Sequence, residues 1–211
     1  MLVAPLGPSV ASPAIAMTSD PRQRRVWARP SIAAGNAFQC TGLLFGCVLL
    51  LAAARARIRS FAVAEMLAAL LAVYLSCHAI AHWFVGRLLG IRFRFYTLGG
   101  AADPRNWPLG LRWLMEHAPF FGVQTDKASM ETAKPLAKAA MWSAGVTSSA
   151  LFPTLAAFWA WRTKIPAGKA VFVFMLIWST GTVLANIFRP TGDYFKARIA
   201  LKAGRRQAEQ I

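Results

Sequence analysis

The chain has 211 residues, of which 56% are hydrophobic and only 15% are charged, and its mean hydropathy is +0.43. This composition is too apolar for a soluble domain of ordinary size, so it excludes a large aqueous domain and a disordered chain. The net charge of +16 would suggest nucleic-acid binding in a soluble protein. Basic residues beside membrane spans lie against anionic lipid headgroups instead, so the expected partner is the lipid bilayer and no nucleic acid.

Four uncharged stretches are each close to the length that crosses a bilayer as a helix. They predict transmembrane helices at about 34–54, 62–87, 139–161 and 169–188. Because these apolar runs are continuous rather than alternating, they favour an all-α polytopic membrane protein over an outer-membrane barrel. In the first stretch, Gly42 and Gly46 have the small-xxx-small spacing that lets a neighbouring helix approach closely.

Lysine and arginine are distributed unevenly among the segments that flank these four stretches. The first, third and fifth segments hold 18 of the 24 basic residues, and the third alone, from Arg87 to Lys138, holds eight. By the positive-inside rule, both termini and this long loop face the cytoplasm. The expected location is therefore a multi-pass position in a membrane, the inner membrane if the source is prokaryotic.

The expected organisation is one membrane domain over 30–195, between a flexible tail over 1–29 and a basic tail over 196–211. After the second stretch, residues 91–96 alternate apolar with polar or basic side chains and end at two glycines. This pattern is typical of a short β segment at the cytoplasmic membrane surface. The aromatic-rich segment over 107–123 is typical of a re-entrant or surface-lying stretch.

Two of the three histidines lie near the cytoplasmic end of the second stretch. His78 and His82 stand at i and i+4, so both imidazoles project from one helix face at a spacing that suits one metal ion. A buried imidazole needs a partner for each ring nitrogen, so packing alone explains such a pair poorly. The alternative is two neutral histidines that bond to Ser, Thr or backbone groups of adjacent helices.

The fourth stretch ends in a sequence that offers a third ligand. Pro190 and Gly192 break the helix near the cytoplasmic face, and Asp193 follows directly. Since the second and fourth stretches run in the same direction, Asp193 is expected at the depth of the two histidines. Two histidines and one carboxylate leave the fourth tetrahedral position of Zn²⁺ open to water, which is typical of catalytic zinc. The alternative is an interfacial ion pair between Asp193 and Arg189 or the basic residues that follow.

The first of these motifs resembles that of the site-2 proteases, which are intramembrane zinc metalloproteases. The family's motif is H-E-x-x-H, followed by a small residue, then Arg and Gly. The stretch from His78 to His82, followed by Gly86, Arg87 and Gly90, is similar to it. The resemblance implies that both histidines bind zinc.

Two further elements of the family have counterparts in the same order along the chain. The family's last motif, an Asn, then prolines, then Asp-Gly, is similar to Asn186, Pro190 and Asp193. Its middle element, Gly-Pro-x-x-Asn, corresponds to residues 145–149, where Gly145 is present and the Pro and Asn are absent. The resemblance covers roughly residues 60–195 and implies a site-2 protease core with Asp193 as the third zinc ligand.

One departure from the family removes a chemical group. The glutamate that takes a proton from the zinc-bound water, and passes it to the leaving amine, is replaced by Ala79. Such a base typically contributes about 10² to 10⁴ in rate, so no catalytic residue is assigned. Glu116 is the only other acidic residue that could fold back to the membrane. The chain is therefore expected to be an impaired enzyme.

Three functions remain open from the sequence. The first is a catalytically impaired, zinc-binding relative of the site-2 proteases that binds transmembrane segments of other proteins or partner proteins. The second is an active zinc metalloprotease that uses a different general base. The third is a membrane scaffold or transporter component without metal, in which His78, His82 and Asp193 form a polar cluster. The first is preferred.

Overall fold

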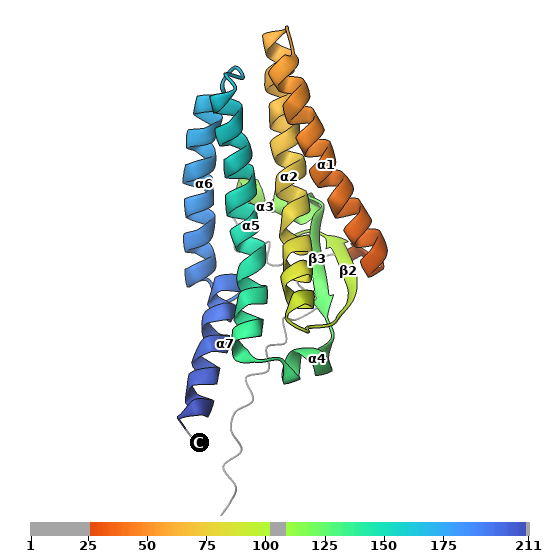
Figure 1. Cartoon of the computed structure of the whole chain (residues 1–211), viewed down its shortest axis with the longest axis vertical. Helices are drawn as coiled ribbons and strands as arrows, with labels where there is room; N and C mark the ends of the chain where they lie inside the picture. Colours follow the sequence, from red (N-terminus) through yellow and green to blue (C-terminus); the bar gives the residue numbers. More distant parts are fainter. Residues whose placement is uncertain (1–25, 102–108, 210–211) are drawn as a thin grey trace, which may run out of the picture.

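Figure 1 shows a computed structural model of the protein, which describes residues 26–101 and 109–209. Four long helices run side by side, and they are α1 (Ile32–Arg55), α2 (Arg59–Leu88), α5 (Pro135–Arg162) and α6 (Gly168–Phe188). The turns that join α1 to α2 and α5 to α6 lie together at one end of the molecule (Figure 1). The sheet and the helices α4 (Lys127–Thr132) and α7 (Asp193–Ala208) gather toward the other end.

Within the described residues, three helices are long and apolar enough to cross a membrane, namely α1, α2 and α6. The sequence predicted four such helices, and α5 is the exception although it has 28 residues. α5 packs against both α2 and α6, and its polar side chains find partners inside the bundle. Ser148 Oγ donates to the carbonyl of Cys77 on α2 at 3.1 Å, and Thr154 Oγ1 lies 2.9 Å from Ser179 Oγ on α6. These hydrogen bonds satisfy groups that lower the hydropathy of α5.

A three-stranded antiparallel sheet lies beside the lower half of α2 in Figure 1. Its order is β1 (Val26–Ala28), β2 (Phe93–Gly99) and β3 (Phe120–Thr125), with β2 in the centre. The short β segment predicted after the second apolar stretch is therefore confirmed as β2, shifted by a few residues. Among the described residues, β2 is the one strand that pairs with β3.

Parts of both predicted tails form regular secondary structure. The segment 1–25 of the predicted N-terminal tail lies outside the described residues, and Val26–Ala28 at its end form β1. Most of the predicted basic tail, 196–211, belongs to α7, which begins at Asp193 and packs against α5. The predicted re-entrant or surface-lying segment contains α3 (Leu109–His117) and the start of β3, and its residues 107–108 lie outside the described part.

Glycines bring α1 close to α2. A Cβ on Gly42 would overlap the side chain of Ser76, and one on Gly46 would lie 2.7 Å from Val73 Cγ2. The close approach predicted from the small-xxx-small spacing is thus confirmed.

The central strand is fixed to α1 by a buried tyrosine. Tyr96 of β2 is fully buried, and its hydroxyl donates to Asn36 Oδ1 at 2.6 Å. The ring occupies space that a Cβ on Gly35 would fill, and the Tyr96 backbone N–H donates to the carbonyl of Pro30 at 2.9 Å. Burial raises the pKa of the Tyr96 hydroxyl above its ordinary value, so this group stays a hydrogen-bond donor. The sheet is thereby held against the lower part of the bundle.

Candidate metal centre

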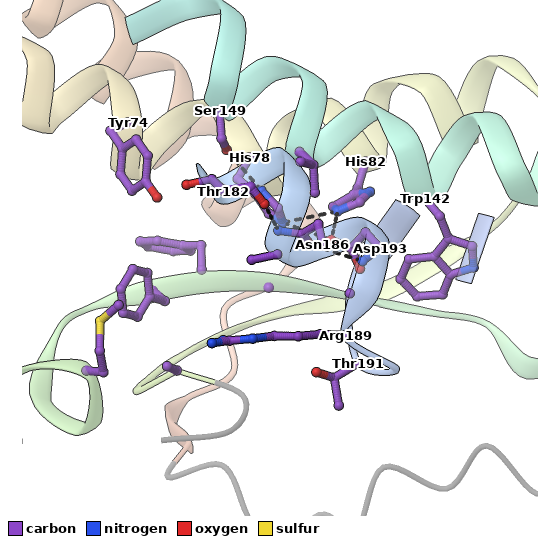
Figure 2. A pocket seen from close by; sticks show the side chains of 18 of the residues that line it. Tyr74, His78, His82, Trp142, Ser149, Thr182, Asn186, Arg189, Thr191 and Asp193 are labelled. Atoms are coloured by element: carbon purple, nitrogen blue, oxygen red, sulfur yellow. Dashed lines mark hydrogen bonds and ion pairs between the residues drawn. The ribbon is translucent and has the colours of Figure 1, made fainter. Parts of the chain in front are cut away.

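Two histidines from α2 and one aspartate from α7 converge on a common point, as Figure 2 shows. The Nε2 atoms of His78 and His82 lie 3.2 Å apart. Asp193 Oδ2 lies 3.4 Å from His78 Nε2 and 3.3 Å from His82 Nε2. The structure therefore brings together the three residues that the sequence singled out as metal ligands, although 111 positions separate His82 from Asp193.

The spacing of these three atoms fits a tetrahedral metal ion. Ligand atoms at about 2.0 to 2.1 Å from Zn²⁺ in tetrahedral geometry lie about 3.3 Å from one another. The three distances of 3.2, 3.3 and 3.4 Å match this value on every edge. Imidazole nitrogens with a carboxylate oxygen form a donor set that zinc accepts readily. The residues present therefore fit the ion, and they could hold one metal with a fourth position free.

His82 is oriented by a hydrogen bond at Nδ1, the ring nitrogen that does not face Asp193. His82 Nδ1 lies 2.6 Å from the backbone carbonyl of Met141, and a carbonyl can only accept. Nδ1 therefore carries the hydrogen, and Nε2 of the neutral ring presents a lone pair to Asp193 Oδ2. Two acceptors that face each other in a buried site repel unless a proton or a cation lies between them.

A hydroxyl group on α5 is the hydrogen-bond partner of Nδ1 of His78. Ser149 Oγ lies 3.0 Å from His78 Nδ1, and this hydroxyl can accept the hydrogen of the tautomer in which Nε2 has the lone pair. Ser149 is buried, whereas the His78 side chain is 35% exposed and lies toward a cavity. The α5 helix thus supplies one hydrogen-bond partner to each imidazole, which is the usual arrangement around histidines that bind metals.

Gly145 makes room for His82. A Cβ at this position would lie 2.5 Å from Cδ2 and 2.6 Å from Cε1 of the imidazole, and it would overlap Nε2. The motif comparison placed Gly145 in the middle element without giving it a role. The structure shows that the absence of a side chain there lets the ring reach its place beside His78 and Asp193.

Three groups hold Asp193 in place. Asn186 Oδ1 accepts from the backbone N–H of Asp193 at 3.1 Å, and Lys196 Nζ donates to Asp193 Oδ1 at 2.9 Å. Gly192 allows the chain to turn beneath α6, because a Cβ there would overlap the carbonyl of Asn186. The Lys196 ammonium at 2.9 Å favours the ionised form of the Asp193 carboxyl group, and Oδ2 is available as a ligand.

The remaining motif residues shape the surrounding backbone rather than the metal centre. Arg87 is exposed in the last turn of α2, and Gly90 ends that helix with a positive φ of 83°. Pro190 lies in the turn between α6 and α7. Ala79 is fully buried and does not line the cavity beside the histidines.

The alternative acidic group considered from the sequence does not reach the centre. Glu116 lies on α3, where its Oε1 accepts from Arg112 Nε at 2.9 Å. Its neighbour Met115 lines the cavity, but Glu116 does not. Among the described residues that line this cavity, Asp193 is the only carboxylate.

His78, His82 and Asp193 line a cavity of about 430 Å³ between the helices and the sheet. Its walls come from α2, α5, α6 and the beginning of α7, and β3 contributes Phe120 to Val123 (Figure 2). Its lining includes the aromatic side chains of Tyr74, Trp142 and Trp178 and the cationic side chains of Arg189 and Lys196.

No protein-family model, no curated protein and no solved structure matches this chain. The resemblance to site-2 proteases therefore stays a prediction, and it rests on the order of the motifs.

Sequence reasoning missed the groups that support the ligands. The carbonyl of Met141 and the hydroxyl of Ser149 carry no signal of their own, since any residue has a carbonyl and serines are common in membrane helices. Lys196 was counted only as part of a basic tail. Its spacing of three residues from Asp193, within one helical turn, is the signal that could have found it.

Proposed function

We propose that this protein is a zinc-binding integral membrane protein that resembles the site-2 proteases and has lost most or all of their catalytic power. His78, His82 and Asp193 hold the metal at the mouth of the cavity. Zn²⁺ bound there supplies a Lewis acid that polarises a carbonyl group. The protein acts by binding membrane segments or partner proteins rather than by cleaving them.

The observation that carries the metal proposal is the triangle formed by Nε2 of His78, Nε2 of His82 and Oδ2 of Asp193. Its three edges span only 3.2 to 3.4 Å, and both histidines have a hydrogen-bond partner at Nδ1. When both rings carry their hydrogen at Nδ1, the three converging atoms are all acceptors, an arrangement that is unfavourable without a cation between them. A cation satisfies all three at once.

The proposed impairment follows from position 79. A methyl group cannot accept or deliver a proton, and the described residues that line the cavity include no second carboxylate. Lys196 is engaged by Asp193, so it offers a positive charge rather than a base. This distribution favours the impaired enzyme over a protease that uses another general base.

The proposed binding role is supported by β3. Residues of this strand also line the cavity, so an extended segment that lies along the strand would lie beside the candidate metal centre. Strand addition provides main-chain hydrogen bonds without any catalysis. The exposed apolar side chains of α1, α2 and α6 would face lipid.

The metal proposal is tested by elemental analysis of purified protein. We expect about one Zn²⁺ per chain in the wild type, and a substantial loss of zinc in the variant that combines His78→Ala with His82→Ala. His117→Ala is the matched control, because His117 lies on α3 and bonds to the carbonyl of Trp113. Substoichiometric metal that the double substitution leaves unchanged would contradict the proposal and favour a polar cluster without metal.

The proposed orientation places both termini and the loop from Arg87 to Lys138 in the cytoplasm. It rests on the 18 to 6 distribution of basic residues and on the arrangement of the sheet, α4 and α7 at one end of the bundle (Figure 1). Reporter fusions after α4 are expected to be cytoplasmic, and fusions in the turn between α5 and α6 are expected on the opposite side. The reverse pattern would place the metal centre at the wrong face.

A further inference from the structure

A second hollow in the surface, a groove of about 760 Å³, lies where the end of α2, the helix α4 and the beginning of α5 meet. Its lining is mainly apolar, and Leu88 and Leu136 in it are 71% and 72% exposed. Removing leucine side chains from water is favourable, so an exposed apolar groove indicates a ligand that covers it. The groove shares no lining residue with the cavity at the candidate metal centre.

The groove lies at the level expected for lipid headgroups. α2 and α6 run side by side in the same direction (Figure 1), and α6 has 21 residues and ends at Phe188. A helix of this length is about 31 Å long, close to the hydrocarbon thickness of a bilayer. His82 lies 3.3 Å from Asp193, which follows the end of α6, and Leu88 is one and a half turns further along α2. The groove is therefore about 9 Å nearer the cytoplasm, just outside the hydrocarbon region in the proposed orientation.

Basic side chains flank this groove. Lys134 lines it, and Arg87 directly precedes the lining residue Leu88. The backbone N–H of Arg92 donates to Oγ of Ser129, another lining residue, at 2.8 Å. All three basic side chains are exposed, and no ion pair within the part of the chain that the structure describes involves them. A ligand of complementary charge is therefore an anion.

The polar residues of the groove suit a phosphate group. Ser129 Oγ already accepts a backbone N–H, and its own hydrogen can be donated to a phosphate oxygen. The Lys134 ammonium adds three N–H donors and a positive charge. The nearby carboxylates have partners of their own. Asp126 Oδ1 accepts from the backbone N–H of Ser129 at 2.9 Å, and Glu131 Oε1 lies 3.9 Å from Lys127 Nζ.

We propose that this groove binds one anionic phospholipid of the cytoplasmic leaflet, with Lys134 and Ser129 at the phosphate and the exposed leucines against an acyl chain. A zwitterionic lipid offers the same chain without a net charge, so it binds more weakly. The level of the groove beside the headgroups favours a lipid over an acidic segment of a partner protein. The inference rests on the proposed membrane orientation and is independent of zinc.

Native mass spectrometry of the full-length protein, freed of lipid in detergent, measures the first bound lipid directly. Phosphatidylglycerol and phosphatidylcholine with identical acyl chains are titrated separately. We expect phosphatidylglycerol to bind at least about tenfold more tightly, since each basic side chain near an anionic headgroup contributes a factor of about five. Glycerol phosphate carries the phosphate without acyl chains and should not displace the lipid. Displacement by it would show a site for free phosphate and overturn the lipid proposal.

Three variants and a matched control locate the effect. Lys134→Met should lower the preference for phosphatidylglycerol about fivefold, whereas Lys134→Arg should keep most of it. Leu136→Ser should weaken the binding of both lipids and leave the preference unchanged. Lys202→Met is the control, because it removes the same charge from an exposed position on α7, at the same end of the molecule, and does not line the groove.

Both Lys134 and Leu136 are exposed, so thermal unfolding of their variants should match that of the wild type. Equal affinities of the wild type for the two lipids would overturn the inference and favour an acidic partner protein. An equal loss of preference in Lys202→Met, or an unchanged affinity for phosphatidylglycerol in Leu136→Ser, would also overturn it. Zinc content and reporter fusions are measured separately, so failure of this inference is distinguishable from failure of the proposed function.

Discussion

Replacement of Ala79 by glutamate is expected to create proteolytic activity in the zinc-loaded protein, or to raise it by about 10² to 10⁴. Position 79 follows the first ligand on α2, so its side chain points about 100° around the helix from His78. Ala79 is fully buried and does not itself line the cavity, but a glutamate is three heavy-atom bonds longer from Cβ to its oxygens. We expect its carboxylate to extend toward the candidate metal centre and to accept a proton there.

The comparison is made with zinc bound, because a second carboxylate buried near Asp193 is costly without a cation to compensate it. Cleavage of a short membrane substrate with a helix-breaking sequence is measured for wild type, Ala79→Glu and Ala79→Gln. The glutamine variant has nearly the same size and cannot act as a base, so it should be as slow as the wild type. Equal and substantial cleavage by wild type and Ala79→Glu would show that another base acts. Equal silence of all three would contradict the predicted gain.

Replacement of Gly145 by alanine is expected to weaken zinc binding by about 10- to 100-fold, the usual cost of disturbing the groups around a metal ligand. The new methyl group would occupy the position of His82 Nε2. The imidazole must then rotate away. This rotation lengthens the 3.3 Å distance between His82 Nε2 and Asp193 Oδ2, or it breaks the hydrogen bond between Nδ1 and the Met141 carbonyl. Competition with a chromophoric chelator measures the change in affinity.

Gly181→Ala is the matched control for this experiment. Gly181 also lies in a long helix, but no atom is within 4 Å of the place where its Cβ would stand. Zinc affinity should be unchanged in this variant. If Gly145→Ala also binds zinc like the wild type, His82 is not held as the structure places it.

The cluster of His78, His82 and Asp193 could be predicted from the sequence because chemistry restricts the residues that can form a metal centre. Few side chains bind zinc, and His78 and His82 share a helix face at a spacing fixed by helical geometry. Asp193 could be matched to them because the direction of each apolar stretch sets the depth of its ends. Lys196 could not be predicted in the same way, since it is one of 24 basic residues. It lies beside Asp193 because α7 begins at Asp193 and brings the two residues within one helical turn.

The helices were predicted more closely than the sheet. Continuous apolar runs identify α1, α2 and α6 directly, whereas β1 and β3 are short and their pairing depends on contacts between distant parts of the chain. α5 shows the limit of hydropathy as a guide. Its serines and threonines bond to neighbouring helices, so its place in the bundle does not require the apolar surface that a lipid-facing helix needs.

Zinc-edge X-ray absorption on the purified wild type tests the central claim most directly, because it reports the atoms bound to the metal. The account predicts one zinc with only nitrogen and oxygen neighbours at about 2.0 to 2.1 Å, including the outer-shell scattering of two imidazoles. The imidazole signal should disappear when both His78 and His82 are replaced by alanine. Sulfur neighbours at about 2.3 Å, or an unchanged spectrum in that double variant, would place the metal elsewhere and contradict the assignment.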